Sequence, residues 1–374
     1  MNIAVDAFPL AAKSASGIPN YTKNILNNLV KVDKQNDYFL YCKNPITFVP
    51  AKNGHVRTSP SATESSTSYG NTVWLFTQGI RLMKKDKIDL LWGTRHMLPP
   101  YLPKGIRKVL TVHDLVWHYF PETMDRYNLL VMELFAGRSI RAADHIIAVS
   151  EATARAIVDV MGVRSEKISV IYHGAGGYVS LDRKSSAEYI SDKYKTRQDY
   201  ILTVSTVEPR KNLKTLLAVF SRFRKGGGPQ LLIAGASGWM TSSIHTEYRR
   251  LGLSEKEVKF LGYVSDEDMN RLYSGARLFL FPSVYEGFGI PPLESMAAGT
   301  PVIASNSSSL PEVVGGAGIL LDPYDVEGWR ESITRVLSER SLQEKLTADG
   351  VERSRHFSWE TAARQTLEVF EKLV

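Results

Sequence analysis

Short apolar runs alternate with longer amphipathic stretches along most of the chain. In the first half, the runs that predict buried parallel strands lie at residues 2–6, 88–92, 108–112, 145–149 and 168–172. The pattern restarts in the second half, at residues 200–204, 230–234, 258–261 and 277–281. The stretches between the runs carry apolar residues at helical spacing, such as Ile18, Tyr21, Ile25 and Leu29. This alternation predicts an α/β fold with parallel sheets.

The restart of the pattern predicts two domains, and 374 residues are enough to form them. Residues 176–198 are polar with little periodicity, so we interpret them as the linker between the domains. A long helix is expected within residues 119–144, and a capped helix begins at Ser358. The predicted organisation is a doubly wound domain at 1–175, a second at 176–355 and a final helix at 356–374.

The composition is that of a globular protein, with 43% hydrophobic and 23% charged residues. No apolar run approaches the roughly 18 residues of a transmembrane helix, and the N-terminus reads as a strand, not a signal peptide. The single Cys42 cannot form an internal disulfide, which favours a cytoplasmic protein and a packing role for this side chain. No G-x-G-x-x-G follows the first strand of either half, which argues against a dehydrogenase.

Part of the net charge of +7 is concentrated in residues 81–108. The cations there are Arg81, Lys84, Lys85, Lys87, Arg95, Lys104, Arg107 and Lys108, against Asp86 and Asp89. A solvated surface accounts for this composition, and so does attraction to an anionic membrane surface or a pyrophosphate-linked lipid acceptor. Nucleic acid is not expected as a partner, because no nucleic-acid-binding motif is visible.

The strongest chemical signal is the loop and helix start at residues 282–294. Gly287 and Gly289 permit a sharp turn and close approach of a ligand, and the amides of residues 288–290 would form an anion site at a helix N-terminus. Glu286 and Glu294 flank this site and are better suited to accept hydroxyl groups than to touch a phosphate. A ligand with phosphate in its middle and hydroxyl groups at both ends is a sugar nucleotide. The alternative is a purely structural strand-to-helix turn.

A second anion site is expected at Arg210 and Lys211, which follow the strand at 200–204 and precede a helix that Asn212 can cap. Two adjacent cations at a strand end suit a diphosphate. A solvent-facing pair of loop residues is the alternative.

Glu286 and Glu294, with seven residues between them, resemble the E-x7-E signature of the retaining glycosyltransferases of family 4. The resemblance extends through Gly287, Phe288, Gly289 and Ile290 to Ser305, and it includes the Glu208-Pro209-Arg210-Lys211-Asn212 segment. It implies the GT-B architecture, with two Rossmann-like domains facing across a cleft and the final helix crossing back to the first domain. It also implies that Arg210 and Lys211 hold the donor diphosphate and act in catalysis with Glu286.

The resemblance assigns further residues to the donor. Gly262, Tyr263 and Val264 match the segment that lines the nucleotide base, and Gly17 matches a glycine loop that approaches the donor. The family usually has two adjacent glycines there, whereas this chain has Ser16 before Gly17, so a simple turn is an alternative. His113 matches a histidine close to the donor sugar and is expected to act in catalysis, and the alternative is a satisfied histidine at a strand end.

No metal site or cofactor is expected. Asp266-Glu267-Asp268 is formally a D-x-D, but Ser265 can cap a helix there and acids in a first turn stabilise it. The leaving diphosphate would then be neutralised by Arg210, Lys211 and backbone amides.

These features predict a metal-independent enzyme that transfers a hexose from a nucleoside diphosphate sugar to a saccharide or lipid-linked acceptor, with retention. GDP-mannose is the first candidate donor, and cell-surface polysaccharide synthesis is the expected setting. The protein is expected to be cytoplasmic, with peripheral contact to the membrane. The alternatives are a nucleotide-sugar epimerase of the same fold and a non-catalytic sugar-nucleotide-binding protein.

Overall fold

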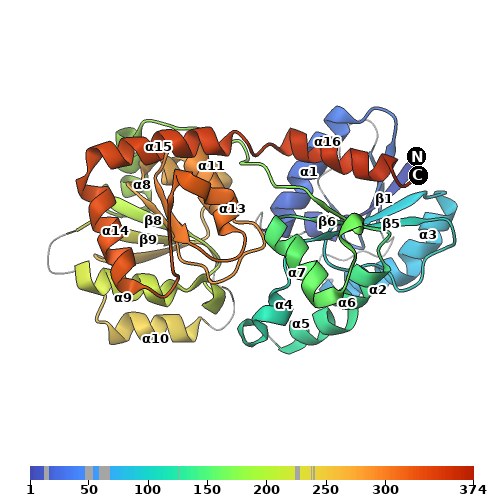
Figure 1. Ribbon diagram of the computed structural model, residues 1–374, viewed down its shortest axis with the longest axis horizontal. Helices are drawn as coiled ribbons and strands as arrows, with labels where there is room; N and C mark the ends of the chain where they lie inside the picture. The colour runs from blue at the N-terminus through green and yellow to red at the C-terminus, as the bar shows by residue number, and fades with distance from the viewer. Residues whose placement is uncertain are drawn as a thin grey trace. The chain divides into compact units, whose positions relative to one another are not determined.

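The computed structural model describes residues 1–11, 17–46, 54–58, 68–124, 126–223, 228–236, 238 and 241–374. The chain forms two compact units, here called the first and second domains (Figure 1). The first consists of Met1–Tyr119, Arg126–Gly174 and Ser358–Val374. The second consists of Ala175–Phe357 together with a short stretch that begins at Phe120. None of the helices in the described parts of the chain has the length and apolar character that crossing a membrane requires.

The first domain is built on a parallel sheet in the order β3-β2-β1-β4-β5-β6-β7, as far as the described residues extend. The order runs outward in both directions from β1 and β4, which makes the sheet doubly wound. Its strands are β1 (Asn2–Asp6), β2 (Asp37–Tyr41), β3 (Gly54–Arg57), β4 (Leu90–Gly93), β5 (Arg107–Val112), β6 (His145–Ala148) and β7 (Ile168–Val170). Its helices are α1 (Ile18–Val32), α2 (Ser68–Trp74), α3 (Ile80–Lys85), α4 (Val116–Tyr119), α5 (Arg126–Val131), α6 (Gly137–Ala142), α7 (Glu151–Met161) and α16 (Trp359–Glu371).

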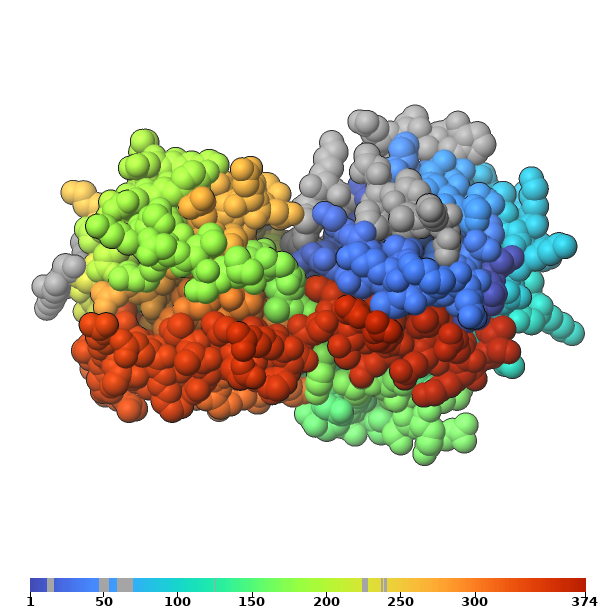
Figure 2. Space-filling model, turned by 90° about the horizontal axis from the view of Figure 1, so that it is seen from above, coloured from blue at the N-terminus to red at the C-terminus, as the bar shows by residue number. Residues whose placement is uncertain are grey.

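The core of the first domain joins the two ends of the chain. The apolar face predicted for α1 is buried through Tyr21, Ile25 and Leu29, and α16 adds Phe370 to the same cluster. Figure 2 places the final helix, in red, alongside α1, in blue. Ser358 caps α16 by accepting hydrogen bonds from the amides of residues 360 and 361, as the sequence predicts.

The second domain repeats the architecture. Its parallel sheet has the order β10-β9-β8-β11-β12-β13, running outward from β8 and β11. Its strands are β8 (Tyr200–Val204), β9 (Gln230–Ala234), β10 (Val258–Gly262), β11 (Phe279–Phe281), β12 (Val302–Ser305) and β13 (Ile319–Leu321). Its helices are α8 (Arg183–Tyr194), α9 (Leu213–Phe223), α10 (Ser242–Arg250), α11 (Asp266–Gly275), α12 (Ile290–Ala297), α13 (Leu310–Val314), α14 (Val326–Ser338) and α15 (Arg340–Ser354).

Both faces of the second sheet are buried, because alternate residues of each strand point to opposite faces. Tyr200 and Leu202 of β8 join the cluster that contains residues of α8 and α11. Ile201, between them, joins the cluster that contains residues of α9 and α14. The near-continuous apolar runs of the sequence therefore reflect strands covered on both sides.

Two predicted segments differ from the structure. The prediction of a linker at residues 176–198 is wrong for its centre, which forms α8 and packs against α11. The prediction of a long helix within residues 119–144 is confirmed for residues 126–142, but that helix is not regular. It contains α5 and α6, joined by a π-helical turn at Met132–Ala136, and a separate 3-10 turn at Pro121–Thr123 precedes it.

Candidate functional site

The loops that follow β8 and β11 lie side by side at the carboxyl edge of the second sheet. β8 and β11 are paired, and the strand order reverses between them, so their ends form the topological switch point. Open α/β sheets bind their ligands at this position. The loop after β8 carries Arg210 and Lys211, and the loop after β11 carries Glu286.

The loop from β11 to α12 has one residue whose backbone only glycine adopts readily. Gly289, directly before α12, has φ 108°, and a Cβ there would lie 2.7 Å from Cδ2 of Leu310. Pro291 and Pro292 then occupy the first turn, where a missing N–H costs no helical hydrogen bond. The sequence predicts this start, and Ile290 is its first helical residue.

Two serines before α13 fix the backbone on either side of Glu286. Ser308 Oγ accepts a hydrogen bond from the Glu286 amide at 2.8 Å. Ser309 Oγ donates to the carbonyls of Glu286 and Phe288, at 2.9 and 2.7 Å. The backbone of this loop is therefore held in place by the hydroxyl groups of the two serines.

Arg210, Lys211 and Glu286 form one ionic cluster. Glu286 accepts from Lys211 Nζ at 2.6 Å through Oε1, and from Arg210 Nη1 at 3.1 Å through Oε2. Arg210 also donates from Nη2 to Glu208 Oε1 at 2.8 Å, and from Nη1 to the Tyr285 carbonyl at 2.6 Å. The two cations are 14% and 12% exposed, and the Glu286 side chain 10%. The cluster pairs two carboxylates with two cations in a nearly buried setting.

Burial and charge oppose each other in this cluster. Burial raises the pKa of Glu286, but Lys211 and Arg210 outweigh it and leave that pKa well below the ordinary value, so the carboxylate is charged. Burial and the adjacent Arg210 lower the pKa of Lys211, and Glu286 counteracts part of this shift. Each charge in the cluster depends on its partners.

Glu294 lies one turn into α12 in a different environment. Its Oε2 accepts a hydrogen bond from the Tyr273 hydroxyl of α11 at 2.9 Å, and the residue is 7% exposed. Burial raises the pKa of Glu294 to about 7, against the effect of the Tyr273 hydrogen bond, with a further rise from Asp266. The two glutamates of the signature therefore differ in charge near neutral pH.

The segment Gly262-Tyr263-Val264 ends β10 at the same edge of the sheet. Gly262 has φ 70° with open space where a Cβ would stand, so its backbone conformation, not crowding, favours glycine. Val264 is buried in the core, whereas Tyr263 is 60% exposed. Of the three side-chain positions, Tyr263 is the one that the fold leaves accessible.

Gly17 and His113 belong to the first domain. Gly17, with φ 59°, directly precedes α1, and the preceding Ser16 lies outside the described residues. His113 follows β5, is 8% exposed and places its Nε2 2.9 Å from the Thr94 carbonyl. A carbonyl only accepts, so Nε2 carries the proton and Nδ1 is an acceptor. Burial and the nearby His96 lower the pKa of His113 to about 4, so the ring is neutral at pH 7.

The D-x-D segment makes structural contacts at the start of α11. Ser265 caps α11 as predicted, and Asp268 is 2% exposed. Asp268 also accepts from Lys193 at 2.8 Å, from Tyr189 at 2.9 Å and from Tyr194 at 2.6 Å, all on α8. Asp268 therefore does more than stabilise the first turn of α11, because its hydrogen bonds also connect α11 to α8. Within the described residues, no group of three or more His, Cys, Asp or Glu side chains is arranged to hold a metal ion.

Sequence reasoning missed two side chains that position the candidate site. Glu208 is 2% exposed and holds the Arg210 guanidinium, and its place two residues before Arg210 was the available signal. Tyr273 holds Glu294, but its position inside an amphipathic helix gave no sign of this contact.

Comparisons with known proteins agree with this organisation. The family model described as Glycosyltransferase Family 4 matches residues 15–175, and the model Glycosyl transferases group 1 matches residues 187–353. O-antigen chain mannosyltransferase B of Escherichia coli is 35% identical over 73% of this chain and 72% of its own length. The serotype-specific mannosyltransferase WbdA of Escherichia coli is 30% identical over 62% of the chain, which spans only 29% of that longer protein.

Solved structures share the fold over the whole chain. Sucrose-phosphate synthase from Thermosynechococcus elongatus has a TM-score of 0.79 at 21% identity, covering 100% of this chain and 99% of its own. Anabaena HepE, solved in complex with UDP-glucose, has a TM-score of 0.75 at 19% identity and covers 100% of both chains. At these identities the likeness concerns the fold alone, and it confirms the predicted pair of Rossmann-like domains of the GT-B class. The two family models and the 35% identical relative show that the chain belongs to the family 4 and group 1 glycosyltransferases.

Proposed function

We propose that the protein is a retaining, metal-independent hexosyltransferase that uses a nucleoside diphosphate sugar as donor. GDP-mannose is the first candidate for this donor. The acceptor would be a saccharide or lipid-linked saccharide in cell-surface polysaccharide synthesis. The donor and acceptor classes are supported by the 35% identity to an O-antigen chain mannosyltransferase. HepE, which binds UDP-glucose, shares the fold, so UDP sugars are the second donors to test.

The observation that carries the proposal is the ionic cluster at the switch point of the second sheet. Arg210 and Lys211 converge on one carboxylate beside the N-terminus of α12. Two cations and helix amides are suited to stabilise the negative charge that develops on a departing diphosphate. In this proposal they supply the charge neutralisation that other glycosyltransferases obtain from a metal ion.

We assign the remaining residues by chemistry. Glu294 would accept the ribose hydroxyls, and Glu286 would face the transferred sugar and contribute to catalysis. Gly262, Tyr263 and Val264 would border the base, with the exposed Tyr263 ring available for stacking. The amides of Gly287, Phe288, Gly289 and Ile290 would face the phosphates. In the first domain, Gly17 would approach the donor, and His113 would offer Nδ1 as an acceptor for a sugar hydroxyl.

For retention without a protein nucleophile, we propose front-face attack assisted by the leaving phosphate. Glu286 is the carboxylate that contacts both cations of the cluster, and we assign it to hydrogen bonding with the sugar hydroxyls and not to attack on the sugar. The acceptor hydroxyl would lose its proton to the departing phosphate oxygen as the sugar–phosphate bond breaks and the new glycosidic bond forms.

Thermal shift against GDP, UDP, dTDP and ADP sugars tests donor choice, because a ligand at a hundred times its dissociation constant adds roughly 2.7 kcal/mol of stability. Incubation of the best donor with a mannose oligosaccharide should then release nucleoside diphosphate and give an α-linked product by NMR. Activity should persist in EDTA. A β-linked product would exclude retention, rescue by Mn²⁺ would exclude metal independence, and donor conversion without acceptor would indicate an epimerase.

We also propose that the first domain contacts an anionic membrane through the amino edge of its sheet. The structure separates the basic stretch into paired and exposed cations. Arg95 is ion-paired with Asp6 at 2.7 Å, and Lys108 lies 3.9 Å from Asp144. The exposed cations are Arg81, Lys84, Lys85, Lys87, Lys104 and Arg107. The Arg107 amide donates to the Asp89 carbonyl at 2.9 Å, which brings the start of β5 beside the turn after α3.

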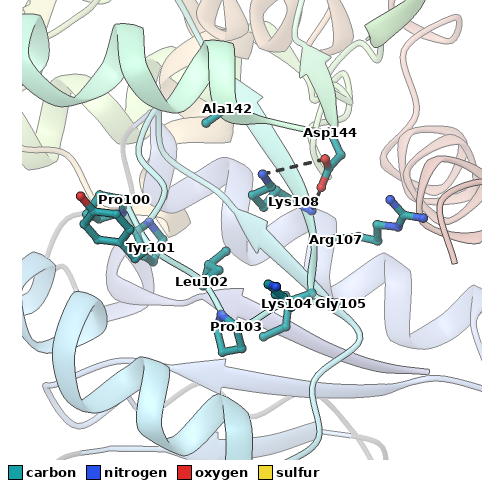
Figure 3. Close-up of a pocket in the computed structure, with 12 residues that line it drawn as sticks. Pro100, Tyr101, Leu102, Pro103, Lys104, Gly105, Arg107, Lys108, Ala142 and Asp144 are labelled. Carbon is teal, nitrogen blue, oxygen red and sulfur yellow. Dashed lines mark hydrogen bonds and ion pairs between the residues drawn. The ribbon is translucent and has the colours of Figure 1, made fainter.

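A cavity of about 580 Å³ lies at this edge, bordered by residues 99–108, Ala142 and Asp144. Figure 3 shows Lys108 directed toward Asp144 while Arg107 points away from both. Tyr101, on the proline-rich loop that borders the cavity, is 84% exposed. An exposed tyrosine among cations suits the headgroup region of an anionic bilayer.

Vesicle co-sedimentation tests this contact. The triple variant K85E, K104E and R107E should lose binding to vesicles that contain phosphatidylglycerol. The control K184E, K256E and K345E makes the same charge change on exposed lysines of the second domain and should retain it. Equal loss in both sets would show that net charge, not this edge, attracts the protein.

A further inference from the structure

The carboxylate of Glu286 contacts the same nitrogens that a diphosphate would need. Lys211 Nζ lies 2.6 Å from one of its oxygens, and Arg210 Nη1 lies 3.1 Å from the other. The two oxygens of a carboxylate and two oxygens of a phosphate make the same kind of charge-assisted contact with such a pair. Glu286 therefore holds the position of an anionic ligand within its own loop.

The two cations differ in how firmly the rest of the protein holds them. Arg210 Nη2 contacts Glu208, and its Nη1 also contacts the Tyr285 carbonyl, so the guanidinium stays anchored if Glu286 leaves. For Lys211, the side-chain contacts that the described residues provide are Glu286 and the Phe281 ring, whose centroid is 5.7 Å from Nζ. Lys211 would therefore need a replacement anion.

Little accessible surface remains on either cation for an additional ligand. The side chain of Arg210 is 14% exposed and that of Lys211 is 12% exposed. The backbone of Glu286 is fixed through its amide by Ser308 and through its carbonyl by Ser309. A diphosphate could therefore reach both nitrogens after rotation of the Glu286 side chain, with the loop backbone unchanged.

We propose that Glu286 is an internal counter-ion of the diphosphate site, and that the donor diphosphate displaces it from Arg210 and Lys211. The displaced carboxylate is then free to turn toward the hydroxyl groups of the sugar. The inference rests on the proposed function of this cluster as the diphosphate site. It adds that binding is an exchange of one anion for another, which couples occupation of the phosphate site to the position of Glu286.

Inorganic pyrophosphate is the probe that isolates this exchange, because it has neither base nor sugar. Glu286→Gln keeps the shape of the side chain but removes the competing charge. Pyrophosphate should therefore bind to this variant roughly ten- to a hundredfold more tightly than to the wild type by calorimetry. Mannose transfer should fall in the same variant. The matched control is Glu331→Gln, an equal change of charge on an exposed position of α14, which should leave pyrophosphate affinity unchanged.

A second variant addresses the possibility that Glu286→Gln disturbs the fold. Glu286→Asp keeps the charge, but its shorter side chain cannot reach both nitrogens from the fixed backbone, so pyrophosphate affinity should lie between those of the wild type and Glu286→Gln. Unchanged or weaker pyrophosphate binding in both variants would overturn the exchange. If the wild type transfers mannose but neither variant binds pyrophosphate more tightly, the anion exchange is rejected and the proposed function stands. If the wild type binds neither pyrophosphate nor any sugar nucleotide, the proposed function is rejected with it.

Discussion

At the scale of single residues, the environment shifts the pKa values of two glutamates of one motif in opposite directions. Glu286 is charged because two cations contact it, and Glu294 is held near neutrality by burial against one tyrosine hydroxyl. The sequence alone predicts that both residues accept hydroxyl groups of a sugar nucleotide. It cannot give the partners, because Tyr273 and Glu208 contact these groups through folding and not through any spacing in the chain.

Lys211→Met should lower turnover by about two to three orders of magnitude, as loss of one group that stabilises developing charge typically does. Arg210→Ala is expected to have an effect of similar size. Lys214→Met is the control, because Lys214 is an exposed lysine in the first turn of the neighbouring α9. Near-normal rates in Lys211→Met and Arg210→Ala, measured at saturating donor, would show that other groups hold the leaving diphosphate.

Glu294→Gln should weaken binding of GDP and remove its pH dependence. The pKa of Glu294 is raised to about 7, so the carboxylate ionises as the pH rises through 7. An ionised carboxylate accepts hydroxyl hydrogen bonds more strongly, so wild-type affinity for GDP should increase between pH 6 and pH 8. Calorimetry at both pH values checks this, and equal pH dependence in Glu294→Gln would assign the effect to another group.

At the scale of elements, prediction from sequence succeeds where runs or stripes of apolar residues determine which positions are buried. It fails where polar contacts hold a helix in place. The strands at 2–6 and 200–204 are confirmed residue for residue, because both faces of the sheets are apolar. The sequence of α8 does not predict a helix, since its exposed positions are polar and its buried ones include Ser186. This helix is held by the hydrogen bonds of Asp268 on α11, which no local pattern reveals.

Asp268→Asn should destabilise the second domain by roughly 1–3 kcal/mol, because it removes the charge of a carboxylate that is itself only 2% exposed and accepts hydrogen bonds from α8. Burial raises the pKa of Asp268, but hydrogen bonds from Lys193, Tyr194 and Tyr189 outweigh it and lower that pKa. The stability it contributes is therefore present above the ordinary value of 3.8 and lost as the pH falls through the lowered pKa.

Urea unfolding at pH 7 and pH 3 checks this prediction, and the gap between wild type and variant should narrow at the lower pH. Asp266→Asn, at an exposed position of the same first turn, is the control and should be mild. If Asp268→Asn instead abolished activity without loss of stability, a functional role for this segment would have to be reconsidered.

At the scale of the whole molecule, the two domains should respond to mild acid in opposite directions. In the first domain, burial lowers the pKa values of His96, His113 and His173. The folded domain then binds fewer protons than the unfolded chain below the ordinary value of 6.5, so its stability falls as the pH falls from 6.5 toward 4. These rings contact one another and Tyr21, so protonation of one opposes protonation of the next.

Glu294 gives the second domain the reverse dependence. Its folded pKa of about 7 exceeds the ordinary 4.5, so its contribution to stability is full below 4.5 and is lost as the pH rises through 7. Calorimetric scans at pH 7.5 and pH 5.5 should therefore show the transition of the first domain moving down and that of the second moving up. A parallel shift of both transitions would contradict these assignments.

The chain leaves the first domain after Gly174 and returns to it at Ser358, with the amide of Ala175 bonded to the carbonyl of Phe357 at 3.2 Å. Apart from the short stretch that begins at Phe120, the second domain is an insertion into the first, and its entry and exit lie side by side. The ribosome therefore makes the first sheet early but supplies α16, which completes that core, only after the whole second domain has emerged. The domain begun first is the one finished last, and until then the apolar faces of Tyr21 and Trp92 lack Trp359 and Phe370 as partners.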